Sequence, residues 1–259
     1  MQLFTTPYHY NLLSDYERLS AFFYAIQENS KGIVYDIGTG SGVLSIFASP
    51  YAKKVYAIEL NQNASLCALE NFKSYPNIQL ISGDAKNIEF REKADLIICE
   101  MLDTALIDEE QIPVIKNMSQ YLKKNGKIIP YKILTGIEPV SMKAEHICYE
   151  NEELPYQEVL GDLQIYNEIN FIKEIKENLN VDLQIKINKK GTFSGVKLTS
   201  FTLLTQDMVC GPTPMMNPPM FIPTSKINVE KNNKIRINLK YQMGGGLDSI
   251  RIKAKKIFK

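Results

Sequence analysis

The sequence predicts an α/β fold in which a doubly wound parallel sheet is followed by a β-rich sandwich or barrel. Between residues 32 and 130, short apolar runs alternate with segments of helical periodicity, which is typical of βαβ units. From Val181 onward, apolar and polar residues alternate one by one, as in antiparallel strands with one face in water. We therefore expect a first domain over residues 1–130 and a second, β-rich domain over residues 131–259.

The elements expected in the first domain begin with a helix inside residues 10–30, for which Ser14 or Asp15 is the expected N-cap. Parallel strands are expected at residues 32–36, 54–59, 77–82, 94–100 and 125–130, with helices at 43–48, 63–72 and about 109–124. Ligands of such sheets bind beyond the carboxyl ends of the strands. Candidate site residues should therefore lie directly after each strand.

The second domain is expected to consist of antiparallel strands, at residues 182–188, 196–201, 234–241 and 249–254. Residues 171–179 are a candidate short helix before them. Residues 211–220 are too rich in proline for a central strand, because proline cannot donate to the ladder. We expect this segment to form a loop.

Composition and charge exclude several classes of protein. The formal net charge is +1 and no basic stripe is apparent, so we expect no nucleic-acid partner. The four cysteines are scattered without a C-x-x-C pair, which favours buried thiols in a reducing compartment over a metal site. The N-terminus lacks a signal-peptide pattern, and no apolar run is long enough to span a bilayer. We expect a cytoplasmic protein without a membrane partner.

The first motif is Asp36-x-Gly38-x-Gly40-x-Gly42, between the first strand and a helix. Glycines let the backbone adopt unusual dihedrals and approach a ligand closely, and the following helix presents free N–H groups. The spacing differs from the G-x-G-x-x-G dinucleotide fingerprint, and the Lys-Ser/Thr of a P-loop is missing. An ordinary glycine-rich turn is the alternative. The motif resembles the first motif of the Rossmann-like S-adenosylmethionine (SAM) methyltransferases.

That resemblance implies SAM as the cofactor and assigns residues to its parts. Glu59 ends the second strand 23 positions after Asp36, the distance at which a strand-end carboxylate reaches ribose hydroxyls in such folds. A simple turn is the alternative for the segment after the third strand. The implied cofactor-binding residues are Asp36, Gly38, Thr39, Gly40 and Gly42 around the amino-acid end, Glu59 and Leu60 at the ribose, and Asp84 and Ala85 at the adenine edge.

A second motif follows the fourth strand, Glu100-Met-Leu-Asp-Thr-Ala-Leu-Ile-Asp-Glu109. It resembles the double-E loop of the protein arginine methyltransferases, in which two glutamates nine positions apart grip the target guanidinium. Asp15-Tyr-Glu-Arg18 matches the family's helix segment whose arginine meets the SAM carboxylate. The resemblance implies that Glu100 and Glu109 are catalytic, that Arg18 binds the cofactor, and that Glu100 also lies against it. It covers nearly the whole chain.

The chemistry agrees with two acids at this place. A guanidinium is a planar fork of donors that suits carboxylates, and methyl transfer requires its nitrogen to be held near the methyl carbon. The alternative for Glu109 is an acidic first turn of the following helix. Tyr10 is a further candidate for the pocket wall.

The acceptor side departs from the family. An aromatic residue and Gly-Tyr usually follow the first glutamate, whereas Met101, Asp103 and Thr104 stand here. The family's Thr-His-Trp loop has no counterpart, because the chain has no Trp and its two histidines both precede the expected place. Residues 217–223 are the expected matching segment. We expect the histidines, His9 and His146, to be surface or packing residues.

The predicted function is SAM-dependent N-methylation of a guanidino, arginine-type or related nitrogen on a protein. A small-molecule methyltransferase on the same scaffold and a SAM-binding regulator without turnover remain alternatives. A nucleic-acid methyltransferase is disfavoured, because the fourth strand lacks an Asn/Asp-Pro-Pro-aromatic motif. The resemblance also implies a possible homodimer, with residues 150–180 as the candidate arm.

Overall fold

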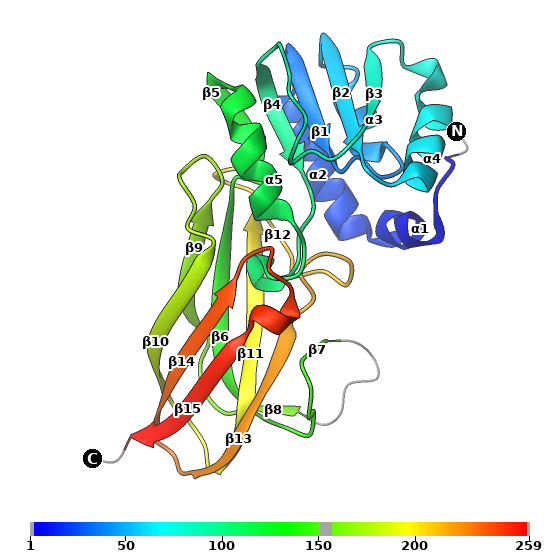
Figure 1. The fold of residues 1–259 in the computed structure, drawn as a ribbon. Coiled ribbons are helices and arrows are strands. Elements are labelled where there is room, and N and C mark those ends of the chain that lie inside the picture. Colours follow the sequence, from blue (N-terminus) through cyan, green and yellow to red (C-terminus); the bar gives the residue numbers. More distant parts are fainter. Residues whose placement is uncertain (1–2, 151–156, 258–259) are drawn as a thin grey trace.

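The computed structural model describes residues 3–150 and 157–257. A parallel sheet with its helices forms the N-terminal half, and antiparallel sheets form the C-terminal half (Figure 1). This arrangement confirms the predicted fold class. The candidate dimer arm lies partly outside the described residues, since residues 151–156 belong to it.

The parallel sheet has the strand order β3-β2-β1-β4-β5. Its order reverses beside β1, and a crevice for ligands is expected at such a switch point. The first, second and fourth strands are predominantly buried, which explains their nearly continuous apolar sequences. The strands are β1 (Ile33–Ile37), β2 (Lys54–Glu59), β3 (Ile78–Ser82), β4 (Ala94–Cys99) and β5 (Leu122–Ile129).

The helices of the N-terminal half differ from the predicted ones at two places. The single helix expected inside residues 10–30 is two helices, because Asp15 has non-helical dihedrals and its Oδ1 accepts the Arg18 N–H at 3.1 Å. The helix expected to reach residue 124 ends at Met118, since the chain from Leu122 onward pairs with β4. The helices are α1 (Pro7–Ser14), α2 (Tyr16–Asn29), α3 (Val43–Ala48), α4 (Gln62–Asn71) and α5 (Gln111–Met118), with 3₁₀ turns η1 (Phe72–Ser74), η2 (Thr104–Leu106), η3 (Ser119–Tyr121) and η4 (Leu247–Ser249).

Two antiparallel sheets make up the C-terminal half. The larger has the order β7-β13-β11-β6-β8, with β9 paired to β6 and β12 paired to β11. Its strands are β6 (Lys132–Met142), β7 (Cys148–Tyr149), β8 (Gln157–Val159), β9 (Gln164–Asn170), β11 (Gly191–Leu203), β12 (Val209–Cys210) and β13 (Met220–Val229). The smaller sheet has the order β10-β14-β15 and consists of β10 (Asn178–Lys186), β14 (Lys234–Gln242) and β15 (Arg251–Ile257).

The short helix predicted at residues 171–179 is wrong. The segment consists of turns and bends until β10 begins at Asn178, which lies opposite Gln242 in the register of β14. Alternating residues of β10 and β14 bury one face of the smaller sheet, and strand pairing therefore prevails over the local helical pattern.

One hydrophobic cluster extends through both halves of the molecule. It includes Ile97 of the parallel sheet, Ile137 of the larger antiparallel sheet and Ile237 of the smaller one. All four cysteines are free; Cys99 and Cys210 are buried, and Cys67 and Cys148 are half-buried. None of the helices in the described ranges combines the length and the apolar character needed to cross a lipid bilayer.

Candidate active site

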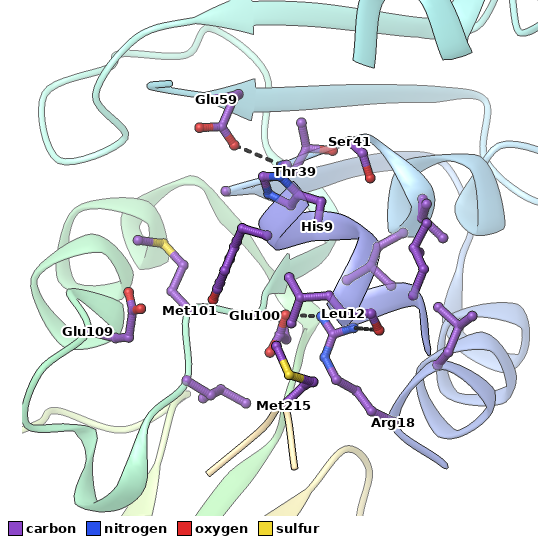
Figure 2. A pocket seen from close by; sticks show the side chains of 18 residues that line it. His9, Leu12, Arg18, Thr39, Ser41, Glu59, Glu100, Met101, Glu109 and Met215 are labelled. Carbon is purple, nitrogen blue, oxygen red and sulfur yellow. Dashed lines mark hydrogen bonds and ion pairs between the residues drawn. The ribbon is translucent and has the colours of Figure 1, made fainter. Parts of the chain in front are cut away.

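A cavity of about 210 Å³ lies beyond the carboxyl ends of β1, β2 and β4 (Figure 2). A smaller cavity of about 70 Å³ shares Gly38, Glu59 and Met101 with it. The two cavities follow the edge of the sheet on both sides of the switch point, where such folds bind ligands. The larger one is lined by Tyr8, His9, Leu12, Leu13, Arg18, Leu19, Gly38, Thr39, Gly40, Ser41, Val43, Leu44, Glu59, Glu100, Met101, Leu102, Glu109 and Met215.

The glycine turn requires its glycines. Gly38, Gly40 and Gly42 have φ of +69°, +58° and +90°, a region that residues with a side chain rarely adopt. A Cβ on Gly40 would lie 2.4 Å from Nε2 of His9, so α1 packs directly on the backbone of the turn. The structure places Gly38, Thr39 and Gly40 in the cavity wall, whereas Gly42 lies outside the lining.

Asp36 also lies outside the cavity lining, and its buried carboxylate holds the glycine turn through hydrogen bonds. It is 1% exposed, and its Oδ2 accepts hydrogen bonds of 2.6 Å from both Thr39 Oγ1 and Ser45 Oγ. Burial raises the pKa of Asp36 to about 6, although these hydrogen bonds favour its charged form. In this structure its carboxylate therefore supports the turn, and the wall is made by its neighbours.

Glu59, at the end of β2, connects the two cavities. Its Oε2 accepts the N–H of Gly40 at 2.8 Å and its Oε1 accepts the N–H of Asn61 at 2.7 Å. Leu60, Asp84 and Ala85, predicted beside it, line the smaller cavity. Asp84 also closes a turn, because its Oδ1 accepts the N–H of Lys86 at 2.9 Å. The sequence offered a simple turn and a ligand-binding residue as alternatives for Asp84. In the structure Asp84 both closes a turn and lines the smaller cavity.

Arg18 and Glu100 form a buried ion pair in the larger cavity. Nη2 of Arg18 donates to Oε2 of Glu100, and Nη1 donates to the carbonyl of Leu12 at 3.4 Å. Burial alone would lower the pKa of Arg18, but the charge and hydrogen bond of Glu100 raise it overall. Its Nε is buried without a hydrogen-bond partner among the described residues. The guanidinium thus has a buried donor that no described group satisfies.

Glu109 lies across the cavity from Arg18 (Figure 2). Burial, and next the charge of Glu100, raise the pKa of Glu109. The same two acids, after burial, raise the pKa of Tyr8, whose phenol lines the cavity. Two carboxylates therefore lie close enough to repel each other, and a cation between them would be stabilised.

Asp103 shapes the loop that joins the two glutamates. Its Oδ2 accepts the N–H groups of Ile107 and Asp108 at 3.0 and 2.9 Å, and its Oδ1 accepts the N–H of Glu109 at 3.3 Å. Burial raises the pKa of Asp103 to about 7. Ala105, which lies between Asp103 and Ile107 in the chain, has a φ of 64°, a left-handed conformation that is uncommon outside glycine. The acid of this loop therefore sets the backbone position of Glu109.

A proline-rich loop from the C-terminal half borders the cavity through Met215. The N–H of Met215 donates to Oδ2 of Asp15 at 3.1 Å, and Thr104 Oγ1 donates to the carbonyl of Pro218 at 2.7 Å. Asn217, fully buried, anchors the loop through a 2.7 Å hydrogen bond to Thr202 Oγ1. The loop over residues 211–219 thus contacts both α2 and the double-E segment, and Met215 enters the wall.

Sequence reasoning missed several lining residues. Tyr10, the predicted wall residue, is 64% exposed and absent from the lining, whereas Tyr8 is in it. His9, predicted at the surface or in packing, also lines the cavity; its Nδ1 lies 2.7 Å from Thr6 Oγ1, and burial lowers its pKa. The start of α1 was the missing signal, because Pro7 at the first position of the helix places residues 9, 12 and 13 on one face.

The comparisons with known proteins agree with this geometry. Residues 34–126 match the sequence model of a family described as "Methyltransferase domain". An uncharacterized protein of Methanothermobacter thermautotrophicus is 43% identical over 251 residues, which cover 96% of this chain and 98% of that protein. A probable histone-arginine methyltransferase 1.4 of Arabidopsis thaliana is 36% identical over 130 residues, covering 46% of this chain and 24% of that protein.

The fold also matches a solved structure, titled a PRMT1 enzyme–prozyme heterotetrameric complex with AdoHcy, from Trypanosoma brucei. The TM-score is 0.80 with 15% sequence identity, and the match covers 97% of this chain and 93% of that one. At this identity the match demonstrates a shared architecture through both halves of the molecule.

Proposed function

Because this chain belongs to one family with the Methanothermobacter protein, and is a SAM-dependent class I methyltransferase that resembles the protein arginine methyltransferases, we propose that it methylates an arginine-type guanidino nitrogen on a protein. The observation that supports this acceptor is the acid pair, since Glu100 and Glu109 line one cavity together with the glycine turn. Carboxylates at this place favour a cationic acceptor.

The residues around the cavity fit the cofactor. Arg18, with a buried and unpartnered Nε, would hold its carboxylate, and the backbone of Gly38 and Gly40 can approach it without side chains. Glu59 would accept hydrogen bonds from the ribose hydroxyls, and Asp84 and Ala85 would meet the adenine edge. When bound, SAM supplies a methyl group on a positively charged sulfur, which is open to in-line attack.

The two glutamates would orient the acceptor and hold its charge. Glu100 and Glu109 each offer two oxygens, and a guanidinium can donate to both in a fixed plane. That plane restricts which nitrogen points along the line of attack, and such positioning lowers the barrier. The raised pKa of Glu109 suits its carboxylate to accept the proton that the methylated nitrogen releases.

The experiment is transfer of labelled methyl from SAM into an extract of the source cells, separated into protein and small-molecule fractions. We expect label in protein, at an arginine guanidino nitrogen located by mass spectrometry. Label confined to small molecules would replace the proposal with a metabolite methyltransferase on the same scaffold. Label on another protein side chain would keep the protein substrate and reject arginine.

Three further expectations belong to this proposal. We propose that residues 1–130 and 131–259 act as two domains, that the protein works in the cytoplasm, and that it forms a homodimer. Limited proteolysis tests the first, fractionation of source cells the second, and light scattering of the purified chain the third.

A further inference from the structure

The smaller antiparallel sheet carries a strongly basic face. In an antiparallel pair, residues directly opposite each other project from the same face of the sheet. Lys240 lies opposite Arg251, Arg236 opposite Lys255, and Lys234 opposite Lys186. We name this surface the basic face; its cations are Lys186, Lys234, Arg236, Lys240, Arg251, Lys253 and Lys255.

These cations are exposed and not neutralised locally. Each is exposed, and none forms an ion pair with any acid in the part of the chain that the structure describes. Asp182 is the acid on the same face in those ranges. Neighbouring strands lie ~4.8 Å apart, and like charges directly opposite each other destabilise a sheet. The chain as a whole has a net charge of only +1, so the clustering of cations on this face is not a consequence of overall charge. A face that keeps such repulsion between its cations points to an anionic partner.

The opposite face of the sheet explains why the charges cannot turn inward. Ile235, Ile237 and Leu239 alternate with the cations of β14 and are fully buried in the core. The expectation that the chain has no basic stripe is therefore wrong. The cations come from three separate segments, with Lys186 from β10 and three each from β14 and β15, and only the pairing of the strands brings them together.

The basic face begins beside the candidate active site. The connection between β14 and β15 bonds to the double-E segment, because Gly244 N–H donates to the carbonyl of Leu106 at 2.8 Å and Gly246 N–H donates to that of Ile107 at 2.9 Å. Figure 1 shows this connection at the end of the sheet that meets the helical half. Lys240 and Arg251 lie at this near end, and Lys234 at the far end.

We propose that the basic face docks an acidic segment of the protein acceptor. The cavity with Glu100 and Glu109 favours a cation, and the adjoining face favours anions, so the two together fit an arginine that stands beside an acidic tract. Nucleic acid fits less well, because it has no cation for the cavity and the face has no aromatic side chain on which bases could stack. The inference rests on the proposed function for the cavity, and names its class of substrate.

The proposal sets the size and the salt dependence of the partner. From Lys234 to Lys240 the strand spans about 20 Å, which an extended tract of about six residues would cover. Exposed charges attract at long range and are screened beyond ~10 Å at 0.1 M salt. The contribution of the tract should therefore appear in KM and weaken as salt rises.

The first experiment compares two synthetic peptides that contain arginine followed by six glutamates or by six serines. KM is measured with labelled SAM at low salt for the wild type and for the triple variant Arg236→Glu, Lys253→Glu and Lys255→Glu. Lys53→Glu, Lys93→Glu and Lys124→Glu form the matched control, since these exposed lysines lie outside the face and outside the ion pairs of the described residues.

For the wild type and the control, we expect KM for the glutamate peptide to be about tenfold lower than KM for the serine peptide. For the face variant, we expect the ratio of these two KM values to approach one. A ratio near one in the wild type would overturn the proposal. So would a ratio that falls in the control as far as in the face variant. If the triple variant does not fold, the double variant Lys253→Gln and Lys255→Gln is used in its place. We expect its ratio of KM values for the two peptides to lie between that of the wild type and one.

A binding measurement separates this inference from the proposed function. The glutamate peptide is labelled with fluorescein, its arginine is replaced by glutamine, and its binding is followed by anisotropy without SAM. Binding to wild type and control but not to the face variant would support the basic face even if no peptide is methylated. Binding of a 20-base-pair RNA or DNA duplex to the face, without binding of the peptide, would reject the acidic protein in favour of nucleic acid.

Discussion

At the scale of the residue, the Arg18–Glu100 pair decides how the cavity can operate. The guanidinium of Arg18 forms an ion pair with Glu100, the same glutamate that we propose binds the guanidinium of the acceptor. Both side chains are about nine-tenths buried, with exposed fractions of 6% and 10%. Each charge would therefore be costly to leave unpaired. An anion that takes Arg18 leaves Glu100 available for a second cation.

This exchange predicts that cofactor and acceptor bind cooperatively. The carboxylate of S-adenosylhomocysteine should draw Arg18 away from Glu100, so that an arginine peptide binds at least about fivefold more tightly with the cofactor product present. Calorimetric titration in both orders checks it, because the coupling must be reciprocal. Arg18→Met should abolish the coupling. Equal peptide affinity with and without the cofactor product would contradict the exchange.

A second prediction concerns the acid pair directly. Glu100→Gln should lower kcat/KM about a hundredfold or more, because an amide holds a guanidinium less well and cannot carry its charge. The affinity for SAM should change by no more than a few fold. The exposed Glu89→Gln is the control and should retain activity. Loss of SAM binding by the Glu100 variant would move this residue from the acceptor to the cofactor.

At the scale of the element, the double-E segment is held together by an internal acid. Asp103 accepts three successive backbone N–H groups, from Ile107, Asp108 and Glu109, and its burial raises its pKa to about 7 although these hydrogen bonds favour the charged form. An unfolded Asp has a pKa of about 3.9, so the folded state binds this proton more tightly. The resulting stabilisation is complete below about pH 4 and is lost as the pH rises through 7.

Asp103→Asn should remove this pH dependence. The free energy of unfolding of the wild type should fall by about 2 kcal/mol more than that of the variant between pH 5 and pH 8. Urea unfolding at the two pH values measures the difference. The asparagine keeps one acceptor oxygen, so the variant can still fold. Parallel pH profiles for the two proteins would show that Asp103 is not the titrating group.

At the scale of the whole molecule, α2 joins the two halves through Asp15. One carboxylate oxygen caps α2 at Arg18, and the other accepts the N–H of Met215 in the proline-rich loop. The loop in turn accepts from Thr104 of the double-E segment through the carbonyl of Pro218. The loop that borders the cavity is therefore held by contacts between segments that lie about 100 to 200 positions apart in the chain.

Asp15→Ala should loosen the contact between the start of α2 and the proline-rich loop. We expect a loss of about 1 kcal/mol in stability from the cap, and faster amide hydrogen exchange over residues 211–219. Asn61→Ala removes the cap of α4, where Asn61 accepts from Asn63 and Ala64, and is the matched control. It should cost similar stability without changing exchange in the loop. Equal exchange in both variants would refute the role of Asp15 in holding the loop.

The predictable parts of the molecule are those governed by neighbouring residues. Apolar runs ending in Asp36, Glu59 and Glu100 predicted the positions of three parallel strands, because a strand buried on both faces needs a nearly continuous apolar sequence. The glycine spacing predicted a close backbone approach, and the structure requires it at Gly40. Fold class and the acid pair followed from these local rules and from the family resemblance.

Tertiary structure decided everything that depends on which segments meet. Met215 enters the cavity wall because a loop from the C-terminal half reaches Asp15, and no local pattern encodes that contact. The basic face arises because strand pairing adds the charges of three segments, each unremarkable alone. Sequence by itself determined local periodicity and strand ends, since these depend on the next few residues. Pairing and packing determined the basic face and the place of Met215 in the cavity wall, since long-range contacts bring together side chains that are far apart in the chain.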